Sequence, residues 1–236
     1  MGLLNYERSG AVATITMDDG KVNCLSPAML RDLGLALDRA GSDDVIVVLT
    51  GRPGQFSAGF DLGVLWPDGE ASHRMVRAGF ELAARLLSYP KPVVVACSGH
   101  AIGMGAFLLL SADIRLGADG PFKISAPEVA IGLTMPLAAI VLCRDRLTPP
   151  AFNRAMVAAE VHSPATAAAA GFLDQVVPGP DLLSAAHEVA DALGRLDLAA
   201  HAATKARVRR EMLAALRAGI EADHAAIRAG AAAQAR

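Results

Sequence analysis

The sequence predicts an α/β core followed by a C-terminal helical region. Short apolar runs such as Val45–Thr50 and Val93–Cys97 alternate with helical patterns up to about residue 147, which favours a buried, mostly parallel sheet. Beyond Pro180 the chain has no further proline and is rich in alanine, leucine and arginine, as amphipathic helices are. Hydrophobic residues make up 53% of the 236 residues and aromatic residues only 4%, which favours helices packed on a sheet over a β-sandwich.

The first half of the chain gives local signals for each element. Two apolar stretches that flank Ser9-Gly10 predict a β-hairpin. Ser26-Pro27 predicts the start of a helix, because serine is a favoured N-cap and proline a favoured first residue; we expect that helix to end near Gly41. The elements expected next are a strand over residues 45–50, a glycine-bearing loop over residues 51–62, a mobile segment over residues 63–72 and a helix over residues 71–88.

The stretch from Val93 to Leu110 combines a buried strand, three glycines and an apolar segment over residues 106–110 that we expect to be a core helix. Where a strand turns through glycines into a helix, the first N–H groups of the helix have no acceptor within it. The helix dipole also favours negative charge at that end. We therefore expect an anion, or an atom that becomes anionic during a reaction, to bind at this turn.

Later elements are predicted in the same way. Thr148-Pro149 and Ser163-Pro164 repeat the combination of cap and proline that starts a helix, and Gly171 is a helix stop. The remaining elements expected here are short strands over residues 113–116, 122–124 and 172–177, and two or three helices over residues 181–236. We predict that residues 1–178 form the core and residues 179–236 the helical region.

Composition excludes several classes of function. A formal net charge of −2 and a pI near 6.3 give no general attraction to nucleic acid or to an anionic membrane. Three isolated cysteines, Cys24, Cys97 and Cys143, fit buried thiols in a reduced cytoplasmic protein better than disulfides or a metal site. The longest apolar run is too short to span a bilayer, and the first residues do not resemble a signal peptide.

Two glycine loops, over residues 51–62 and 99–106, each follow a buried strand. If those strands are parallel, both loops emerge at the same edge of the sheet, where open α/β folds bind ligands. Two backbone N–H groups can then point at one oxygen atom. The alternative is that the glycines only make tight turns.

Three other glycine motifs fit less well. The dinucleotide fingerprint fails because Gly103-Met104-Gly105 is followed by Leu108 where glycine is required, and no loop carries the Gly-Lys-Ser/Thr of a P-loop. Ser98 does not meet the Gly-x-Ser-x-Gly pattern of a hydrolase nucleophile elbow, because Ala96 and His100 occupy the two glycine positions.

Five motifs occur in register between about residues 4 and 178. They are Phe56-Ser57-Ala58-Gly59-Phe60-Asp61-Leu62, Gly99-His100-Ala101-Ile102-Gly103-Met104-Gly105, Ala112-Asp113-Ile114-Arg115, Pro127-Glu128-Val129-Ala130-Ile131-Gly132 and Gly171-Phe172-Leu173-Asp174-Gln175-Val176-Val177. Together they resemble the crotonase (enoyl-CoA hydratase/isomerase) superfamily. That resemblance implies a spiral of ββα units, a C-terminal helical region used in trimerisation, and a homotrimer or dimer of trimers.

The resemblance also implies an acyl-CoA thioester as substrate, with coenzyme A as part of the substrate and neither a metal nor a redox cofactor. In such proteins the thioester oxygen lies between two backbone N–H groups, which correspond here to those of Phe60 and Met104. Negative charge develops on this oxygen during the reaction, and one preorganised donor contributes roughly 10²–10³ in rate.

Family hydratases carry two catalytic glutamates, and only one has a counterpart here. The resemblance aligns the first with Phe107 and the second with Glu128. A single glutamate in an apolar pocket has a raised pKa and can both accept and return a proton, which suits the isomerisation of a 3-enoyl-CoA to a 2-enoyl-CoA. The alternatives are a 2-enoyl-CoA hydratase of fatty-acid oxidation and a non-catalytic acyl-CoA-binding protein. For Glu128 the alternative is a residue that only favours a helix start.

Other residues receive weaker roles. We expect Asp113 to be structural, Asp61 to cap the next helix or bind substrate, and His100 to be a satisfied loop residue or to line the pocket. The basic residues Lys205, Arg207, Arg209 and Arg210 either meet the phosphates of CoA or form a solvated face. The further substrate-binding residues are predicted to be Lys21, Val22, Ala58, Gly59, Asp61, Leu62, Gly103, Gly105 and Phe107.

Overall fold

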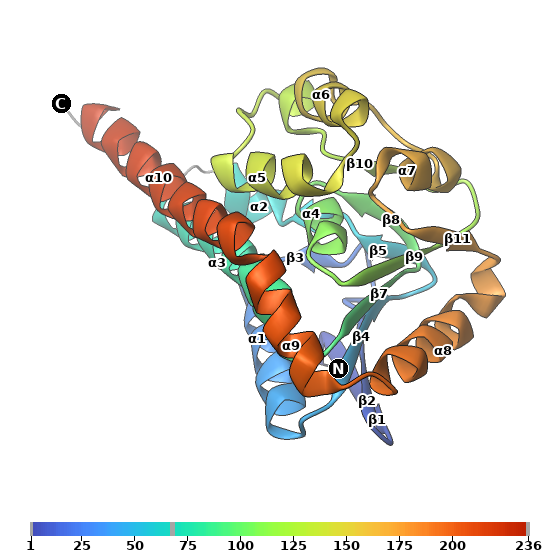
Figure 1. Ribbon diagram of the computed structural model, residues 1–236. Coiled ribbons are helices and arrows are strands. Elements are labelled where there is room, and N and C mark those ends of the chain that lie inside the picture. Colours follow the sequence, from blue (N-terminus) through green and yellow to red (C-terminus); the bar gives the residue numbers. More distant parts are fainter. Residues whose placement is uncertain (1, 67–68, 235–236) are drawn as a thin grey trace.

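The computed structural model of the protein describes residues 2–66 and 69–234, with side chains up to residue 226. A six-stranded sheet forms the centre (Figure 1). Strands β1 and β2 form the predicted hairpin and pair antiparallel, while the other neighbours pair parallel. In spatial order the strands are β1 (Leu4–Ser9), β2 (Val12–Met17), β4 (Ile46–Gly51), β7 (Val93–Cys97), β9 (Ile114–Ala118) and β11 (Gln175–Val177).

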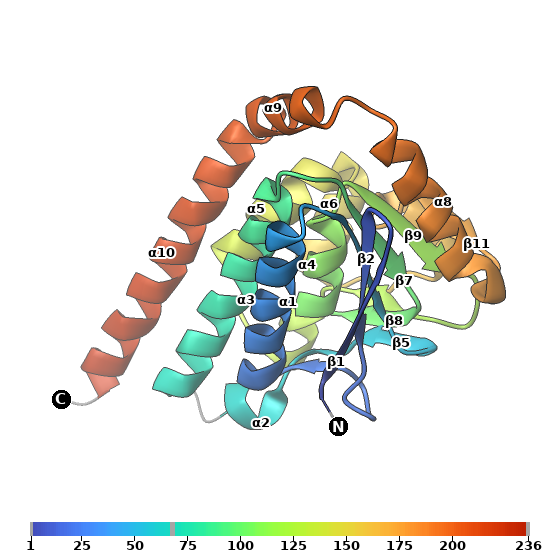
Figure 2. The same ribbon diagram turned by 90° about the horizontal axis from the view of Figure 1, so that it is seen from below.

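The central strands are buried on both faces, as their apolar runs predict. In β4, for example, every residue is buried, and alternate side chains enter two different hydrophobic clusters. Val47 and Leu49 belong to the larger cluster, whereas Ile46 and Val48 pack in the smaller one with helix α8 (Leu182–Gly194). Figure 2 shows α8 on the opposite side of the sheet from α1 (Pro27–Ser42) and α3 (Glu70–Ser88).

The two loops that we predicted over residues 51–62 and 99–106 are partly strands, so that prediction is wrong in detail. β5 (Gly54–Ser57) and β8 (Gly99–Ile102) pair with each other, and β8 also pairs with β10 (Ile124–Ser125) to form a second, three-stranded sheet. These strands have only two to four residues, and β5 and β8 begin with glycine, so they lack the alternation that identifies a strand. Each central strand is therefore followed first by a strand and then by a helix.

Helical predictions agree with the structure to within a few residues. Ser26 accepts the N–H of Met29 as the N-cap of α1, and Ser163 caps α7 through Thr166. The mobility expected of residues 63–72 stays a prediction. Most of α2 and the start of α3 fall in that segment, and Pro67 and Asp68 lie outside the described residues. The other elements are β3 (Cys24–Leu25), β6 (Gly59–Phe60), α2 (Leu62–Leu65), α4 (Met104–Leu110), η1 (Glu128–Ile131), α5 (Leu137–Arg146), α6 (Pro149–Ala158), α7 (Pro164–Ala170), η2 (Gly179–Asp181), α9 (Leu198–Val208) and α10 (Arg210–Gln234).

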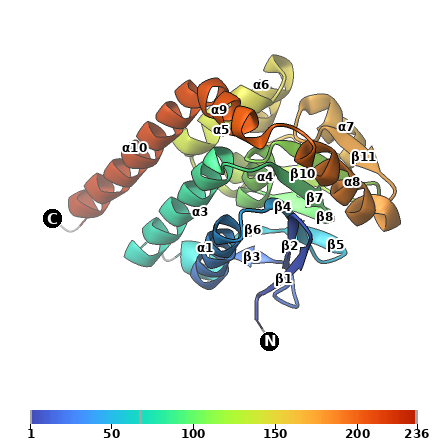
Figure 3. The same cartoon turned by 60° about the horizontal axis from the view of Figure 1, so that its bottom comes forward.

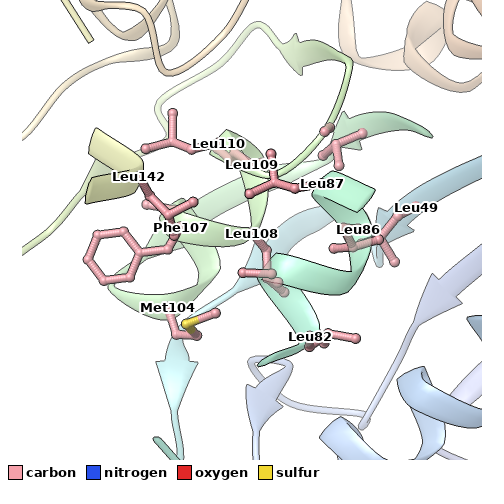
Figure 4. Packing of buried hydrophobic residues seen from close by; sticks show 14 of the residues in the cluster. Leu49, Leu82, Leu86, Leu87, Met104, Phe107, Leu108, Leu109, Leu110 and Leu142 are labelled. Carbon is pink, nitrogen blue, oxygen red and sulfur yellow. The ribbon is translucent and has the colours of Figure 1, made fainter. Parts of the chain in front are cut away.

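Helix α4 lies at the centre of the larger cluster, and every one of its residues is buried. Figure 4 shows Met104 and Phe107 on α4 among leucines of α3 and α5. The helix begins at Gly103, whose φ is +53°, a backbone conformation that favours glycine. The burial of α4 therefore fixes the position of the turn at its start.

The basic cluster near residue 205 divides into a buried pair and an exposed pair, so the prediction of a solvated face is wrong for two of its members. Lys205 and Arg209 are only 8% and 9% exposed. The carboxylate of Asp113 accepts from Lys205 Nζ at 2.6 Å and lies 2.7 Å from Arg209 Nη2, and it also accepts the N–H of Val93. Asp113 thus has the structural role that we predicted, because it connects the helices after residue 197 to the sheet.

The predicted division at residue 178 stays a prediction, as does the trimer. Helix α8 covers one face of the central sheet, while α10 runs alongside α3 on the other side of the molecule (Figure 3). In the described part of the chain, no helix is long and apolar enough to cross a membrane.

Candidate active site

An apolar cavity of about 530 Å³ opens between α2, α3, the start of α4 and the segment after β10. Its lining is mostly hydrophobic, and Glu128 is the one acidic residue among the described residues that form it. The lining residues are Ala58, Gly59, Phe60, Leu62, Leu65, Trp66, Ser72, His73, Val76, Phe80, Ile102, Gly103, Met104, Phe107, Pro127, Glu128, Ile131, Leu133, Thr134 and Pro136.

The two glycine turns meet at this cavity, as the sequence predicts. Strands β4 and β7 are parallel neighbours, so the chain segments that follow them reach the same edge of the sheet. A Cβ on Gly59 would lie 2.7 Å from the carbonyl oxygen of Ile102 and 3.3 Å from the nitrogen of Met104. Only glycine allows this approach, and the φ of Gly59 is +86° as well. The backbone at residues 59–60 therefore lies directly beside the N–H of Met104.

Met104 is the first residue of α4, where N–H groups have no acceptor within the helix. Its side chain and the ring of Phe60 both point toward Gly79 of α3. The Phe60 ring also contacts the ring of Phe80 edge to face, with centroids 6.4 Å apart. The two residues predicted to act through their backbones thus use their side chains for packing.

Glu128 begins the 3₁₀ turn η1, and its carboxyl group lies beside the turn at Gly103. A Cβ on Gly103 would be 3.2 Å from Glu128 Oε1. Its other carboxylate oxygen, Oε2, is buried and has no hydrogen-bond partner among the described residues. Burial raises the pKa of Glu128 from 4.5 to about 7, and a bond to its own backbone opposes this shift only in part. The group can therefore exchange a proton near neutral pH.

Phe107 lies one turn into α4 and lines the cavity. Its ring is 1% exposed and stacks on Phe80, with centroids 5.9 Å apart and an angle of 30° between the planes. The position that the resemblance aligns with the first of the two hydratase glutamates thus holds a packed aromatic ring.

Four of the predicted substrate-binding residues do not line the cavity: Lys21, Val22, Asp61 and Gly105. Val22 accepts the N–H of Ala58 through its carbonyl oxygen at 2.9 Å, which holds the first glycine turn from behind. Asp61 caps α2 by accepting the N–H of Gly63, one of its two predicted roles. Gly105 allows close packing, because a Cβ there would lie 2.6 Å from the carbonyl oxygen of Ser57.

His100 is a satisfied residue of the small sheet. Its Nδ1 accepts the N–H of Lys123 at 3.0 Å, and its ring meets that of Phe122 at a right angle. It is not part of the cavity lining, so of the two predicted roles the structure supports the first.

Sequence reasoning missed most of the cavity wall that α3 provides. Ser72, Val76 and Phe80 line the cavity and recur every four residues on one face of α3. That spacing was the available signal. None of the described side chains of the C-terminal helices lines the cavity. They lie behind its walls instead. No group of three or more potential metal ligands occurs among the described residues.

This arrangement of paired strands, a central buried helix and a carboxylate beside two glycine turns defines a protein of the crotonase fold. Comparison with known proteins agrees, because the sequence profile described as Enoyl-CoA hydratase/isomerase matches residues 7–234. The chain belongs to the enoyl-CoA hydratase/isomerase family and is an enzyme of that family.

Both activities occur among the names of similar proteins. A putative enoyl-CoA hydratase of Thermus thermophilus is 32% identical over 214 residues, which are 88% of this chain and 82% of that protein. A Mycobacterium tuberculosis protein is named an enoyl-CoA isomerase in one solved structure and a probable enoyl-CoA hydratase in another. The first of these structures has a TM-score of 0.92 at 48% identity and covers 95% of this chain and 98% of its own. Human mitochondrial delta3-delta2-enoyl-CoA isomerase has a TM-score of 0.89 at 28% identity, with coverage of 95% and 92%.

Proposed function

We propose that this enzyme isomerises a 3-enoyl-CoA to a 2-enoyl-CoA with Glu128 as the group that moves the proton. The observation that carries this proposal is the single buried carboxylate in an otherwise apolar cavity, with Phe107 where a hydratase has its other glutamate. The name of the human relative supports it, whereas the Mycobacterium tuberculosis relative carries both names.

The backbone N–H groups of Phe60 and Met104 bind the thioester oxygen in this mechanism. Glycine at positions 59 and 103 lets the two segments approach each other and the ligand closely. When a proton leaves C2 of the acyl group, negative charge spreads from the carbon onto this oxygen, and the two donors stabilise it. Because the donors belong to the main chain, their side chains remain available for packing.

Glu128 performs both proton transfers. As a carboxylate it removes a proton from C2, and the electron pair of that C–H bond forms the new C2–C3 double bond. The electrons of the former C3–C4 double bond then take up a proton at C4. The same carboxyl group supplies that proton and returns to its ionised form. A pKa of about 7 suits this exchange, because neither form is strongly favoured at neutral pH.

The reaction removes a hydrogen from C2 and adds one to C4, so the overall oxidation level of the substrate is unchanged. We therefore propose that neither a redox cofactor nor a metal is needed and that coenzyme A enters as part of the substrate. We further propose that Ala58, Leu62 and Gly103 border the thioester end of the substrate, since they flank the two donors and line the cavity. The apolar side chains around Phe80 and Phe107 then hold the acyl chain.

Hydration of a 2-enoyl-CoA is the second candidate, and the name of the Thermus thermophilus relative favours it. Hydration requires an attacking water to be held and activated. The cavity provides Glu128 for this, but at position 107 it presents a phenyl ring that can neither accept nor donate a proton. Isomerisation is therefore the better match to this site.

The test uses purified wild-type protein and a Glu128→Gln variant, each given 3-enoyl-CoA and 2-enoyl-CoA of several chain lengths. We expect the wild type to isomerise the 3-enoyl substrate, and the variant to bind acyl-CoA but turn over at least about 10²-fold more slowly. Unchanged isomerisation by the variant would overturn the mechanism. Rapid hydration by the wild type would favour the hydratase, and tight binding without turnover of either substrate would indicate a binding protein.

A further inference from the structure

Helix α10 contacts α3, which lines the cavity, and α5, which directly follows a lining segment, but it does not line the cavity itself. It lies alongside α3 (Figures 2 and 3) and packs against the start of α5. Helix α3 supplies Ser72, Val76 and Phe80 to the cavity, and the segment that leads into α5 supplies Leu133, Thr134 and Pro136. The polar contacts that α10 makes with α3 and α5 therefore help to set the positions of the residues that line the acyl site.

Asp223 of α10 holds the first turn of α5. Its Oδ1 accepts the N–H of Leu137 at 2.9 Å and its Oδ2 accepts the N–H of Ala138 at 3.1 Å. The residue at the N-cap of α5 is Pro136, whose side chain makes no capping bond. A carboxylate from another helix thus satisfies two N–H groups that would otherwise have no acceptor within α5.

Gly219 brings the two helices close enough for this contact. A Cβ at that position would lie 3.0 Å from the nitrogen of Ala138 and 3.2 Å from the carbonyl carbon of Leu137. The backbone of α10 therefore rests directly on the first turn of α5, one helical turn before Asp223.

The start of α5 is joined to the catalytic carboxylate through the chain between them. Leu133 donates its N–H to the carbonyl oxygen of Glu128 at 2.8 Å, which closes the turn that carries the carboxylate. Pro136, which immediately precedes α5, lines the same cavity. The segment from Glu128 to Pro136 is thus bounded by its own hydrogen-bonded turn at one end and by the contact with Asp223 at the other.

On the opposite side, α10 forms the support behind the α3 wall. Arg77 of α3 donates to both carboxylate oxygens of Glu221, at 3.1 and 2.5 Å. A gap between the two helices is lined by Ile220, Asp223 and His224 of α10 and by three residues of α3 that also line the acyl cavity, namely His73, Val76 and Phe80.

We propose that Asp223 is a positioning residue of the acyl site: by holding the start of α5 against α10, it fixes the Glu128–Pro136 segment at the distance from α3 that an acyl chain requires. This inference rests on the proposed function, because it takes an acyl-CoA as the ligand. It assigns a role in the site to a residue that does not touch the cavity.

The test measures binding by isothermal titration calorimetry with decanoyl-CoA, a saturated ester that cannot isomerise, and with free CoA. The proteins are wild type, Asp223→Ala and, as a matched control, Glu211→Ala, which removes an exposed carboxylate from the same helix. Loss of a charged helix cap corresponds to about tenfold in a conformational equilibrium. We therefore expect Asp223→Ala to bind decanoyl-CoA about tenfold more weakly, and to bind CoA with unchanged affinity.

An Asp223→Asn variant keeps one acceptor oxygen and should lose less affinity than Asp223→Ala; it also serves if the alanine variant does not fold. Equal affinity of wild type and both Asp223 variants for decanoyl-CoA, or an equal loss for CoA and decanoyl-CoA, would overturn the inference alone. Failure of the wild type to bind decanoyl-CoA would overturn the proposed function, and this inference with it. The control should match the wild type for both ligands.

Discussion

The ring of Phe60 lies where Gly79 has no side chain. A Cβ built on Gly79 would be 2.6 Å from two carbon atoms of that ring and 3.4 Å from the sulfur of Met104. The side chains of the two proposed N–H donors therefore converge on one glycine of α3, a helix separate from both glycine turns. The donors keep their positions because this glycine leaves room for them.

We predict that Gly79→Ala impairs catalysis more than stability. Alanine is favoured over glycine in a helix by about 1 kcal/mol, which offsets part of the clash with Phe60. Relief of the clash must move the Phe60 ring and with it the backbone of one donor, so we expect kcat to fall at least about tenfold. Steady-state kinetics and thermal unfolding check the two effects.

Gly34→Ala is the matched control for Gly79→Ala. Gly34 lies within α1, and a Cβ there would meet its nearest neighbour, a nitrogen of Arg85, at an ordinary 3.8 Å. The control should raise the free energy of unfolding by about 0.5–1 kcal/mol and leave kcat unchanged. If Gly79→Ala behaves in the same way, Gly79 has no part in positioning the donors.

The pKa of Glu128 predicts the pH dependence of the reaction. Burial raises this pKa to about 7, and the carboxylate is the form that accepts the proton from C2. Isomerase kcat/KM should therefore rise with pH through about 7 and then level off. Initial rates between pH 4 and 9 at low substrate concentration measure it; a midpoint near the ordinary glutamate pKa of 4.5 would contradict the assignment.

The burial of Glu128 also predicts how stability depends on pH: stability should fall as pH rises, whereas kcat/KM should rise. Between pH 4.5 and about 7 the folded protein keeps a proton on Glu128 that the unfolded chain releases, so the contribution of this group to stability falls as pH rises through that window. Glu128→Gln removes this contribution. We expect the variant to be more stable than the wild type at pH 8, with a smaller difference at pH 5, as measured by urea unfolding at both pH values.

We predict that Phe107 separates this enzyme from the hydratases. Phe107→Glu should add hydration of 2-enoyl-CoA that the wild type lacks, while it lowers stability because a carboxyl group replaces a ring packed on Phe80. Phe107→Leu is the control: it should keep isomerase activity within about tenfold and add no hydration. Product analysis by absorbance and mass spectrometry distinguishes the two reactions. Substantial hydration by the Phe107→Leu variant would contradict the role given to this position.

Asp113→Asn should be among the most destabilising substitutions far from the cavity. It leaves the buried cations Lys205 and Arg209 without their shared counter-ion, and breaking a buried pair costs about 3–5 kcal/mol. Urea unfolding measures this cost. Glu211→Gln, at an exposed contact with Arg210 of 4.0 Å, is the control and should change stability by less than about 0.5 kcal/mol. A loss of stability below about 1 kcal/mol for Asp113→Asn would contradict the structural role given to Asp113.

Much of the fold follows from local patterns. β-branched runs, serine caps followed by proline, and glycine stops determined β4, β7, α1 and α7 to within about one residue, because these elements depend on neighbours in the chain. The short strands β5, β8 and β10 were missed as a sheet, since they are stabilised by pairing between segments that lie 20 or more residues apart. Such partners leave no periodic trace in the sequence.

The sequence by itself determined the chemical groups of the site: Glu128, the glycines at 59 and 103, and the phenylalanine at 107. Tertiary structure alone decided what surrounds them. It stacks Phe80 on Phe107 and packs the Phe60 ring against Gly79, where a side chain would clash. It also places Asp223 at the start of α5, although the two lie 86 residues apart in the chain. The burial of a side chain and its distance from other residues depend on which helices pack against each other. That packing is set only when the whole chain has folded.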